Sequence, residues 1–386
     1  MTLFYAAFAA LVGLIILFIK LFNKPELNST MANDPTSNNS EQVEEADSEA
    51  DDEEIEDTFP DVVADTEDFS QVFDFGGYPS DEKGLAVIPS GSPQKIAMVF
   101  GINVCSKEVY GDKLKLRGCV NDAEDVRKML VGAGFGRIYT FYDKTATISN
   151  FLKTWKTVRE TIKEGDTLFI SMSRHGMSML RNHLEQDTEI RAENEDGNIY
   201  SGDQAAVMHD GVIVDDCFWR LFSDLPKVKI IYWNDSCHSA TQYKVALSPK
   251  GKWKATAPIP RSVGPEYMPA KDRVLDLVQL NTLFPKTTKK PDFTLVSLAG
   301  CQDHEYSADA YINKKYHGAF TFCALEHLSK NPKATFLELS EAVKKGLKAR
   351  RFSQNPQFNV VANGVEVSAN DAAYNEIMGQ PIFPLK

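Results

Sequence analysis

A histidine and a cysteine each come just after an apolar run, and together they have the chemistry to attack a carbonyl group. Residues 168–172 are largely apolar and lead through Ser173 into His175, and residues 230–233 lead into Cys237. A thiolate is a strong nucleophile, and a neighbouring imidazole promotes its formation by taking the proton. We therefore expect Cys237 to be a nucleophile and His175 its general base, provided that two adjacent strands bring them together.

Gly176 follows this histidine and suggests how the anion of such a reaction would be stabilised. Without a side chain, its backbone can approach a substrate closely. Its N–H and that of Cys237 are the expected donors of an oxyanion hole. A lone cysteine at a strand end is more often a small buried apolar residue, so the prediction depends on the pair.

Alternating strands and helices are predicted from residue 95 onward. The expected strands are 96–104, 138–142, 167–172, 228–233, 294–298 and 357–361. The expected helices are 121–131, 147–163, 317–329 and 335–350, and the stretches 184–210 and 241–291 are expected to be long connections. This pattern predicts an α/β fold with a mostly parallel sheet covered by helices on both faces. Functional residues collect at the carboxyl ends of such strands, where both reactive residues fall.

The start of the chain has the composition of a membrane anchor. Residues 2–19 carry no charged side chain, and counted through Phe22 the run has about the 20 apolar residues that a spanning helix needs. No Lys or Arg precedes the run, which argues against the alternative of a cleaved signal peptide. We expect residues 1–23 to be a single-pass anchor that contacts the membrane through residues 2–22. Basic residues follow the run, so the catalytic domain is expected in the cytoplasm.

Residues 24–94 are expected to form a disordered acidic linker. Between Pro25 and Glu82 there are 20 Asp or Glu and no Lys or Arg, and the rest of the chain has 42 basic and 34 acidic residues. So much charge with so few apolar residues cannot bury a core. A folded domain is therefore expected at residues 95–386. Its basic residues are not interleaved with aromatic ones, so nucleic acid is not an expected partner.

Six cysteines are scattered without paired spacing, so neither a structural zinc site nor disulfides are expected in a cytoplasmic domain.

Several blocks of the sequence resemble the metacaspases, cysteine peptidases of the caspase-like clan. Residues 173–176 resemble the family's Ser-Gly-His-Gly block, and residues 235–240 its Asp-Ser-Cys-His-Ser-Gly block. Three further segments resemble family blocks in the same order: 117–122, 300–309 and 355–357. The resemblance covers about two thirds of the chain. It implies a caspase-like sandwich, with a mostly parallel central sheet flanked by helices, and cysteine endopeptidase activity.

The resemblance also implies a class of substrate. Metacaspases cleave after Arg or Lys, and the acidic residues that match Asp122 and Asp235 line the primary specificity pocket. Ser173 and Cys119, in the same blocks, are expected to line it as well. Two carboxylates in a pocket would attract a guanidinium or ammonium group and repel an acidic side chain. The expected partners are protein substrates with Arg or Lys at the cleavage site, bound by a monomeric enzyme. The alternatives are that Asp122 only begins a helix and Asp235 only forms a turn.

Calcium activates many metacaspases, and Asp215 and Asp216 match a pair of calcium ligands in that family. Oxygen ligands are the kind that calcium requires. However, Ile199 and Lys244 occupy positions where the family has two further carboxylates, and only Asp196 or Asp203 is placed to compensate. Calcium binding and a simple solvated acidic turn therefore both remain open.

Two departures from the family pattern lie beside the reactive residues. Arg174 replaces a glycine next to His175, and Ala240 replaces another after the cysteine block. A cation at 174 would oppose an imidazolium, favour a thiolate and have the length to reach into the cleft. Self-processing at basic residues is common in the family, and the exposed sites expected here are Lys83, Lys95 and the stretch 244–261.

Three other readings of the sequence remain. The main alternative is a catalytically weak or inactive pseudoprotease that acts as a membrane-tethered scaffold, with Arg174 blocking the cleft. A second is another Cys-His peptidase of the same fold, such as the legumain or clostripain groups, although Asn121 and Asp122 fit metacaspases better. A third is a membrane-bound module whose acidic linker recruits basic partners.

Overall fold

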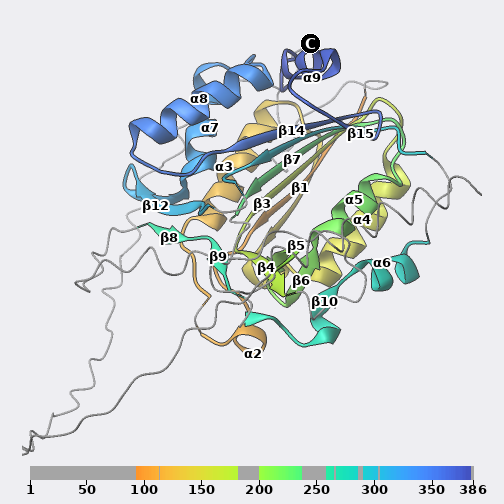
Figure 1. Ribbon diagram of the computed structural model, residues 1–386, viewed down its shortest axis with the longest axis vertical. Helices are drawn as coiled ribbons and strands as arrows, with labels where there is room; N and C mark the ends of the chain where they lie inside the picture. The colour runs from red at the N-terminus through yellow and green to blue at the C-terminus, as the bar shows by residue number, and fades with distance from the viewer. Residues whose placement is uncertain are drawn as a thin grey trace, which may run out of the picture. The chain divides into compact units, whose positions relative to one another are not determined.

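A seven-stranded sheet forms the centre of the protein (Figure 1). The computed structural model describes residues 93–112, 114–180, 200–236, 258–264, 267–285, 290–302 and 305–383. The strand order is β15-β14-β11-β7-β3-β1-β2. These strands are β1 (Lys95–Gly101), β2 (Arg137–Tyr142), β3 (Thr167–Ser173), β7 (Lys229–Asp235), β11 (Thr294–Ala299), β14 (Gln357–Ala362) and β15 (Val365–Val367). From β2 to β11 all neighbours are parallel, and β14 and β15 are antiparallel, so the predicted mostly parallel sheet is confirmed.

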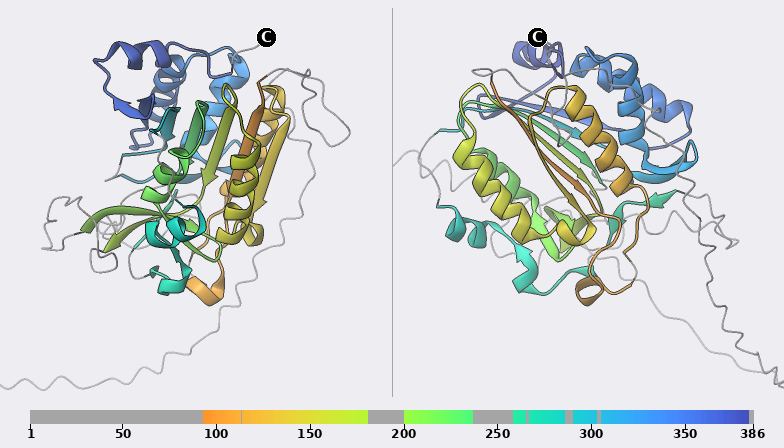
Figure 2. Two further views of the ribbon diagram at one scale, coloured as in Figure 1. Left: turned by 90° about the vertical axis from the view of Figure 1, so that its right-hand side faces the viewer. Right: turned by 180° about the vertical axis from the view of Figure 1, so that it is seen from behind.

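Helices cover both faces of this sheet (Figure 2). One face carries α4 (Ile148–Thr161) and α5 (Asp215–Phe222), and the other carries α3 (Cys119–Gly132), α7 (Ala319–Lys330) and α8 (Phe336–Ala349). Strand side chains point alternately to the two faces of the sheet. Because helices cover both faces, the central strands carry apolar side chains on both sides. In β1, Met98 and Phe100 face the first layer, while Ala97 and Val99 face the second.

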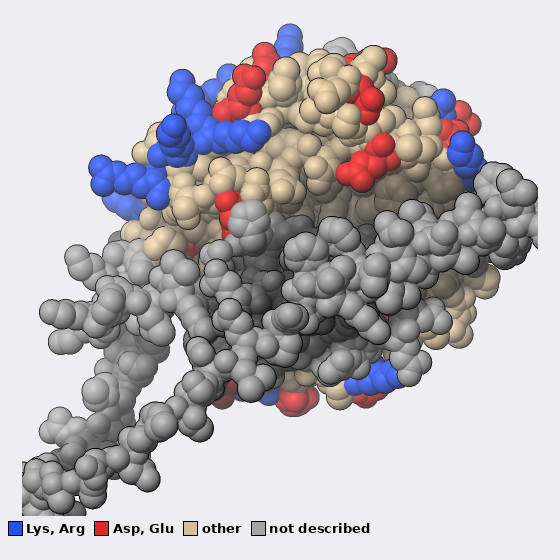
Figure 3. All heavy atoms as spheres, in the orientation of Figure 1, with Lys and Arg blue, Asp and Glu red and all other residues tan. Residues whose placement is uncertain are grey.

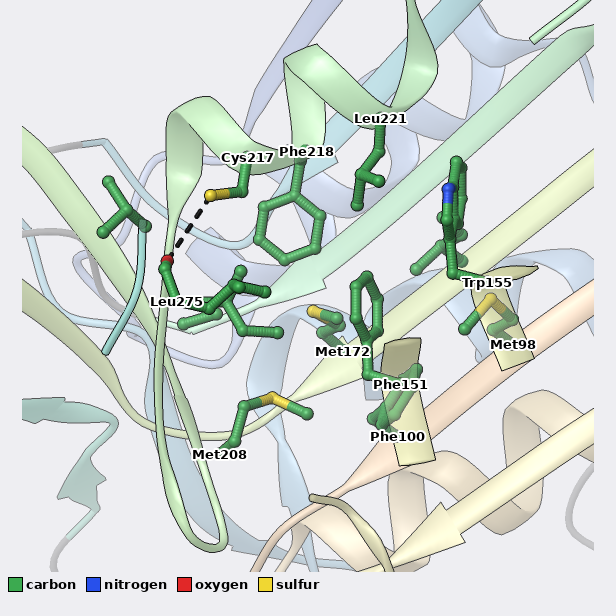
Figure 4. Packing of buried hydrophobic residues seen from close by; sticks show 14 of the residues in the cluster. Met98, Phe100, Phe151, Trp155, Met172, Met208, Cys217, Phe218, Leu221 and Leu275 are labelled. Atoms are coloured by element: carbon green, nitrogen blue, oxygen red, sulfur yellow. Dashed lines mark hydrogen bonds between the residues drawn. The ribbon is translucent and has the colours of Figure 1, made fainter. Parts of the chain in front are cut away.

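Large aromatic side chains fill the layer between the sheet and the helices α4 and α5 (Figure 4). Phe151 and Trp155 of α4 are fully buried, and Phe151 lies 5.9 Å from Phe100 and 5.8 Å from Phe218, measured between ring centroids. Edge and tilted contacts of this kind add to the free energy gained by burying apolar area. This packing holds α4 and α5 against the strands of the central sheet.

Two smaller sheets lie beyond the carboxyl ends of the central strands. One has the order β10-β6-β5-β4-β9, and the other β13-β12-β8. Their strands are β4 (Gly176–Leu180), β5 (Tyr200–Met208), β6 (Gly211–Val214), β8 (Ile259–Pro260), β9 (Ser262–Val263), β10 (Val274–Leu275), β12 (Ala308–Ile312) and β13 (Lys315–Gly318). The remaining helices are α2 (Lys107–Tyr110), α6 (Leu277–Leu283) and α9 (Ala372–Met378).

The sequence prediction was wrong in the two stretches read as connections. Residues 200–208 form strand β5, and the described part of 241–291 contains β8, β9, β10 and α6. Strands β8, β9 and β10 have two residues each, which is too short for alternation to be visible in the sequence. The helix predicted to start at His317 starts two residues later in the structure, at Ala319. His317 belongs to β13, and Gly318 is the N-cap of α7.

The predicted anchor at residues 1–23 and nearly all of the predicted linker lie outside the described residues. Within the described part of the chain, no helix is long and apolar enough to cross a bilayer. The described chain is held to the domain from Gln94, whose backbone N–H donates to Asp166 Oδ1 at 2.7 Å.

Lys and Arg side chains gather on one side of the surface, over α8 (Figure 3). The exposed members in this helix and the turn after it are Lys344, Lys345, Lys348 and Arg351. Part of the positive charge that the sequence assigns to the folded domain is therefore concentrated on one helix, outside the central sheet.

Candidate active site

The pairing of β3 with β7 places the two predicted reactive residues after strand ends that lie side by side. These strands are parallel neighbours, and Ser173 at the end of β3 pairs with Asp235 at the end of β7. His175 and Cys237 each follow a member of that pair by two residues. Cys237 lies outside the described residues, so the Cys-His contact stays a prediction. The described chain reaches Ser236, which is fully buried.

His175 is buried at this end of the sheet, with 5% of its surface exposed. Among the described residues, neither ring nitrogen has a hydrogen-bond partner. Burial, helped by the positive charges of Arg261 and Arg174, lowers the pKa of His175 to about 3. In this environment the imidazole is neutral at physiological pH and is a weaker base than an ordinary histidine.

Gly176, the predicted oxyanion-hole donor, begins β4, and its backbone N–H takes part in the parallel pairing of β4 with β9. This N–H donates to the carbonyl oxygen of Arg261 at 2.8 Å. The predicted oxyanion donor is therefore already paired with a carbonyl group of the chain itself.

The four residues predicted to line the specificity pocket lie together. Asp122 is in the first turn of α3, and Cys119 begins the same helix. The hydroxyl of Ser173 donates to Asp122 Oδ2 at 2.8 Å. Asp122 and Asp235 are completely buried, and both have side-chain partners far away in the sequence, such as Arg261 for Asp122 and Thr321 for Asp235. Burial also raises the pKa of Cys119 well above its ordinary value, which makes this cysteine a poor nucleophile.

Arg261 fills the space between these residues, and the sequence analysis did not foresee this. Its side chain is fully buried. Nη2 donates to Asp122 Oδ2 at 2.7 Å and to Asp309 Oδ1 at 3.0 Å. Nη1 donates to Ser173 Oγ at 2.6 Å and lies 3.4 Å from Asp235 Oδ2. The predicted self-processing stretch 244–261 thus ends in an arginine that is buried rather than exposed.

The carboxylates around Arg261 differ in how readily they ionise. Burial opposes charge on Asp122, but Arg261 and His317 outweigh it and hold the pKa of Asp122 below its ordinary value. For Asp235, burial outweighs the attraction of Arg261 and raises the pKa above its ordinary value. Asp235 is stabilised by Ser307 and Thr321, whose hydroxyls donate to it at 2.5 and 2.7 Å. The positive charge of Arg261 therefore favours the ionised form of both carboxylates, Asp122 and Asp235.

Asp309 and Gly318 also lie against Arg261, and neither was assigned a role from the sequence. Asp309 accepts hydrogen bonds from the backbone N–H groups of Arg117 and Gly118, at 2.8 and 2.9 Å, and so fixes the start of α3. A Cβ atom at Gly318 would lie 2.1 Å from Asp235 Oδ2 and 2.5 Å from Arg261 Nη1. The Ser-Ala-Asp block at 307–309 was the available signal for Asp309.

Arg174 points into the protein, and its described contacts do not support the alternative in which it blocks the cleft. Its guanidinium is buried and donates to the carbonyl oxygen of His175 at 2.8 Å and to Asn234 Oδ1 at 3.3 Å. The side chain supports the turn after β3 from within the protein. Its charge nevertheless acts on the imidazole as expected, because it contributes to the lowered pKa of His175.

Lys95, another predicted self-processing site, is also less accessible than expected. It begins β1, is half-buried, and its ammonium donates to the carbonyl oxygen of Ala133 at 2.8 Å. A peptide bond within a paired strand is a poor substrate for a peptidase.

Asp215 and Asp216 are the first residues of α5, where carboxylates suit the helix dipole. Asp215 Oδ1 accepts the backbone N–H groups of Gln204 and Asp216, at 3.3 and 3.1 Å. In the described ranges no group of three or more His, Cys, Asp or Glu is placed to hold a metal ion. Since calcium takes six to eight oxygen ligands, this pair by itself does not make a calcium site.

The five described cysteines are buried thiols that form no disulfide with one another. One of them, Cys217, donates its thiol to the carbonyl oxygen of Leu275 at 3.4 Å within the aromatic layer (Figure 4). Their burial gives these thiols a packing role.

Comparison with known proteins agrees with this arrangement. The family described as "Caspase domain" matches residues 94–365. A protein named Metacaspase-1 from Kluyveromyces lactis is 25% identical over 299 residues, which cover 68% of this chain and 65% of that protein. Metacaspase-1 from Ajellomyces capsulatus is 26% identical over 297 residues, covering 68% of this chain and 78% of that protein.

A solved structure is similar in fold. The crystal structure of a protein from Geobacter sulfurreducens matches with a TM-score of 0.51 and 22% identity, covering 76% of this chain and 99% of that one. The family match, the relatives and the sheet topology agree: the chain belongs to the caspase-domain family of cysteine peptidases, and its similar relatives are metacaspases.

Proposed function

We propose that the protein is a cysteine endopeptidase that cleaves after Arg, and less efficiently after Lys, with Cys237 as nucleophile and His175 as general base. His175 takes the thiol proton, the thiolate attacks the scissile carbonyl, and the imidazolium returns the proton to the leaving amine. Gly176, with the backbone N–H of Cys237, stabilises the oxyanion. Water then hydrolyses the thioester.

One observation carries the choice of substrate: the predicted specificity pocket binds a guanidinium. Arg261 shows that the space among Asp122, Asp235 and Asp309 accepts an arginine side chain with hydrogen bonds from both terminal nitrogens. A planar group with a fixed fork of donors fits this arrangement better than a single ammonium, hence the preference for Arg over Lys. An acidic side chain would be repelled.

The test is hydrolysis of a short fluorogenic peptide amide with Arg before the scissile bond. The full chain is expected to release the fluorophore, and Cys237→Ala and His175→Ala should lower the rate by at least about a thousandfold. Cys217→Ala is a matched control, because this buried thiol belongs to the core under α5. Undiminished hydrolysis by Cys237→Ala would refute the assignment.

The same pocket also supports the alternative of a scaffold without activity. In that alternative Arg261 is a structural residue and the proposed dyad is inactive, so the chain would hydrolyse no Arg peptide even when Arg261 is replaced and the pocket is open. The peptide assay on Arg261→Ala therefore separates the two functions.

Calcium, membrane attachment and assembly are proposed on narrower grounds. Asp215 and Asp216 support at most a partial calcium site, and activity measured with calcium and with a chelator decides whether the ion matters.

The uncharged run at residues 2–19 supports a single-pass anchor with the domain on the cytoplasmic side, testable by membrane extraction and protease protection. The short, charged edge strand β15 disfavours pairing of sheet edges and supports a monomer, testable by light scattering.

A further inference from the structure

A six-residue segment of the chain, residues 258–263, runs across the site between two of the sheets. Ile259 and Pro260 form β8, which pairs antiparallel with β12. Ser262 and Val263 form β9, which pairs parallel with β4. Arg261 stands between the two strands and is fully buried. Figure 1 shows β8 beside β12 and β9 beside β4.

The backbone of Arg261 makes the contacts that a peptide substrate needs at the bond to be cleaved. Its carbonyl oxygen accepts the N–H of Gly176 at 2.8 Å. Its own N–H donates to the carbonyl oxygen of Ser307 at 3.0 Å. The first contact aligns the carbonyl with the predicted oxyanion donor, and the second extends the pairing of β8 with β12 by one residue.

The side chain of Arg261 fills the specificity pocket at the same time. Its guanidinium bonds to Asp122, Asp309 and Ser173, all buried. The residues before it lie along a pocket of about 200 Å³, whose lining includes Ser307, Ala308, Phe352 and Gln354. Backbone, side chain and preceding residues are thus all bound as in an extended substrate.

We propose that residues 258–263 are a built-in, substrate-like inhibitor, and that external substrates must displace Arg261 from the pocket. The inference rests on the proposed function, since it assigns a regulation to the same pocket. The pocket holds one guanidinium, so internal and external arginines exclude each other. A tethered ligand competes at an effective concentration of about 1 mM, which weakens the binding of any external peptide.

The test compares peptide binding with Arg261 present and absent, in a background that cannot cleave. The probe is acetyl-Pro-Ile-Pro-Arg-amide, which repeats residues 258–261, and acetyl-Pro-Ile-Pro-Glu-amide is its control. Affinities are measured by calorimetry on full-length Cys237→Ala, alone and combined with Arg261→Ala. The Arg peptide is expected to bind at least about tenfold more tightly when Arg261 is absent. The Glu peptide should bind neither protein.

Matched variants separate loss of the inhibitor from loss of stability. Arg220→Ala, in the same background, removes another buried arginine, whose Nη1 lies 2.7 Å from Asp224 Oδ1. Its other described partners are Asn281 and Phe284, which are not among the residues around Arg261. The variant should leave the affinity for the Arg peptide unchanged. If Arg261→Ala does not fold, Arg261→Lys keeps a positive charge among the carboxylates and should still bind the peptide several-fold more tightly than the parent.

Equal affinity with and without Arg261 would overturn the inference, and so would a folded Arg261→Ala protein that does not bind the Arg peptide. Neither result depends on catalysis. Conversely, tighter binding together with no hydrolysis by any active-site-intact variant would refute the proposed peptidase and leave the internal ligand in place.

Discussion

The backbone N–H of Gly176 donates a hydrogen bond of 2.8 Å to the carbonyl oxygen of Arg261. The carbonyl belongs to the Arg261–Ser262 peptide bond, so the proposed oxyanion hole assigns this bond the place of a scissile bond. The predicted nucleophile follows β7, whose last residue, Asp235, accepts through its carbonyl oxygen a hydrogen bond from Arg261 Nη1 at 3.1 Å. Arg261 is therefore connected to both strand ends that carry the proposed dyad.

The first prediction is that the wild-type chain cuts itself between Arg261 and Ser262. The thiolate of Cys237 would form a thioester with Arg261, the amine of Ser262 would leave with a proton, and water would release the Arg261 carboxylate. Intact-mass measurement and terminal sequencing after incubation should find a new terminus at Ser262. Cys237→Ala should remain whole. Cuts confined to other basic residues would contradict the prediction.

The second prediction concerns Asp122 and substrate charge. Asp122→Asn should lower kcat/KM for an Arg peptide by about 10- to 100-fold, because a hydrogen bond to a charged group contributes about 1.5–3 kcal/mol. Asp125→Asn is the matched control: it is a buried carboxylate on the same helix, 3.9 Å from His317 Nδ1, but without a described contact to Arg261. Equal losses in the two variants would mean that Asp122 acts only on stability.

The third prediction uses the close approach at Gly318. Gly318→Ala would push a methyl group against Asp235 and Arg261, and should destabilise the fold by about 1–3 kcal/mol while abolishing binding of Arg peptides. Gly346→Ala is the control, because this glycine lies in α8 and an added Cβ would meet Cys323 Sγ at 3.1 Å. Urea unfolding and calorimetry check both effects. Normal peptide affinity in Gly318→Ala would argue against this pocket.

The fourth prediction follows from the burial of His175. Its pKa is lowered from 6.5 to about 3, so the neutral form is favoured in the folded protein. The unfolded chain takes up this proton at higher pH, so the associated stability is present above pH 6.5 and is lost as the pH falls towards 3. The expected loss is about 1.4 kcal/mol per pH unit in that window. Urea unfolding at pH 7 and pH 5 should show this slope, and His175→Gln should lack it.

Removing Arg261 should change the same titration. Arg261 is one of the causes of the lowered pKa, so Arg261→Ala should raise the pKa of His175 towards its ordinary value. NMR titration of the ring protons measures the shift directly. A His175 that titrates near 6.5 in the wild type would contradict both expectations.

The sequence alone was sufficient to predict the central sheet and its reactive strand ends. The runs that became β3 and β7 are apolar and uninterrupted, and each ends in a polar turn with one reactive residue, a pattern that depends only on local composition. The blocks around Asp122 and Asp235 also pointed to one pocket. The sheet was predictable because long strands buried on both faces leave uninterrupted apolar runs in the sequence.

The occupant of the pocket was decided only by tertiary structure. Arg261 is 139 residues from Asp122 and 26 from Asp235, and it stands in a Pro-rich stretch that resembles an ordinary connection. The inward turn of Arg174 was equally hidden, since its partners His175 and Asn234 come from two different strand ends. A buried charge is tolerated only where opposite charges and hydrogen bonds converge on it. That convergence is a property of segments brought together by folding, and no local pattern of residues contains it.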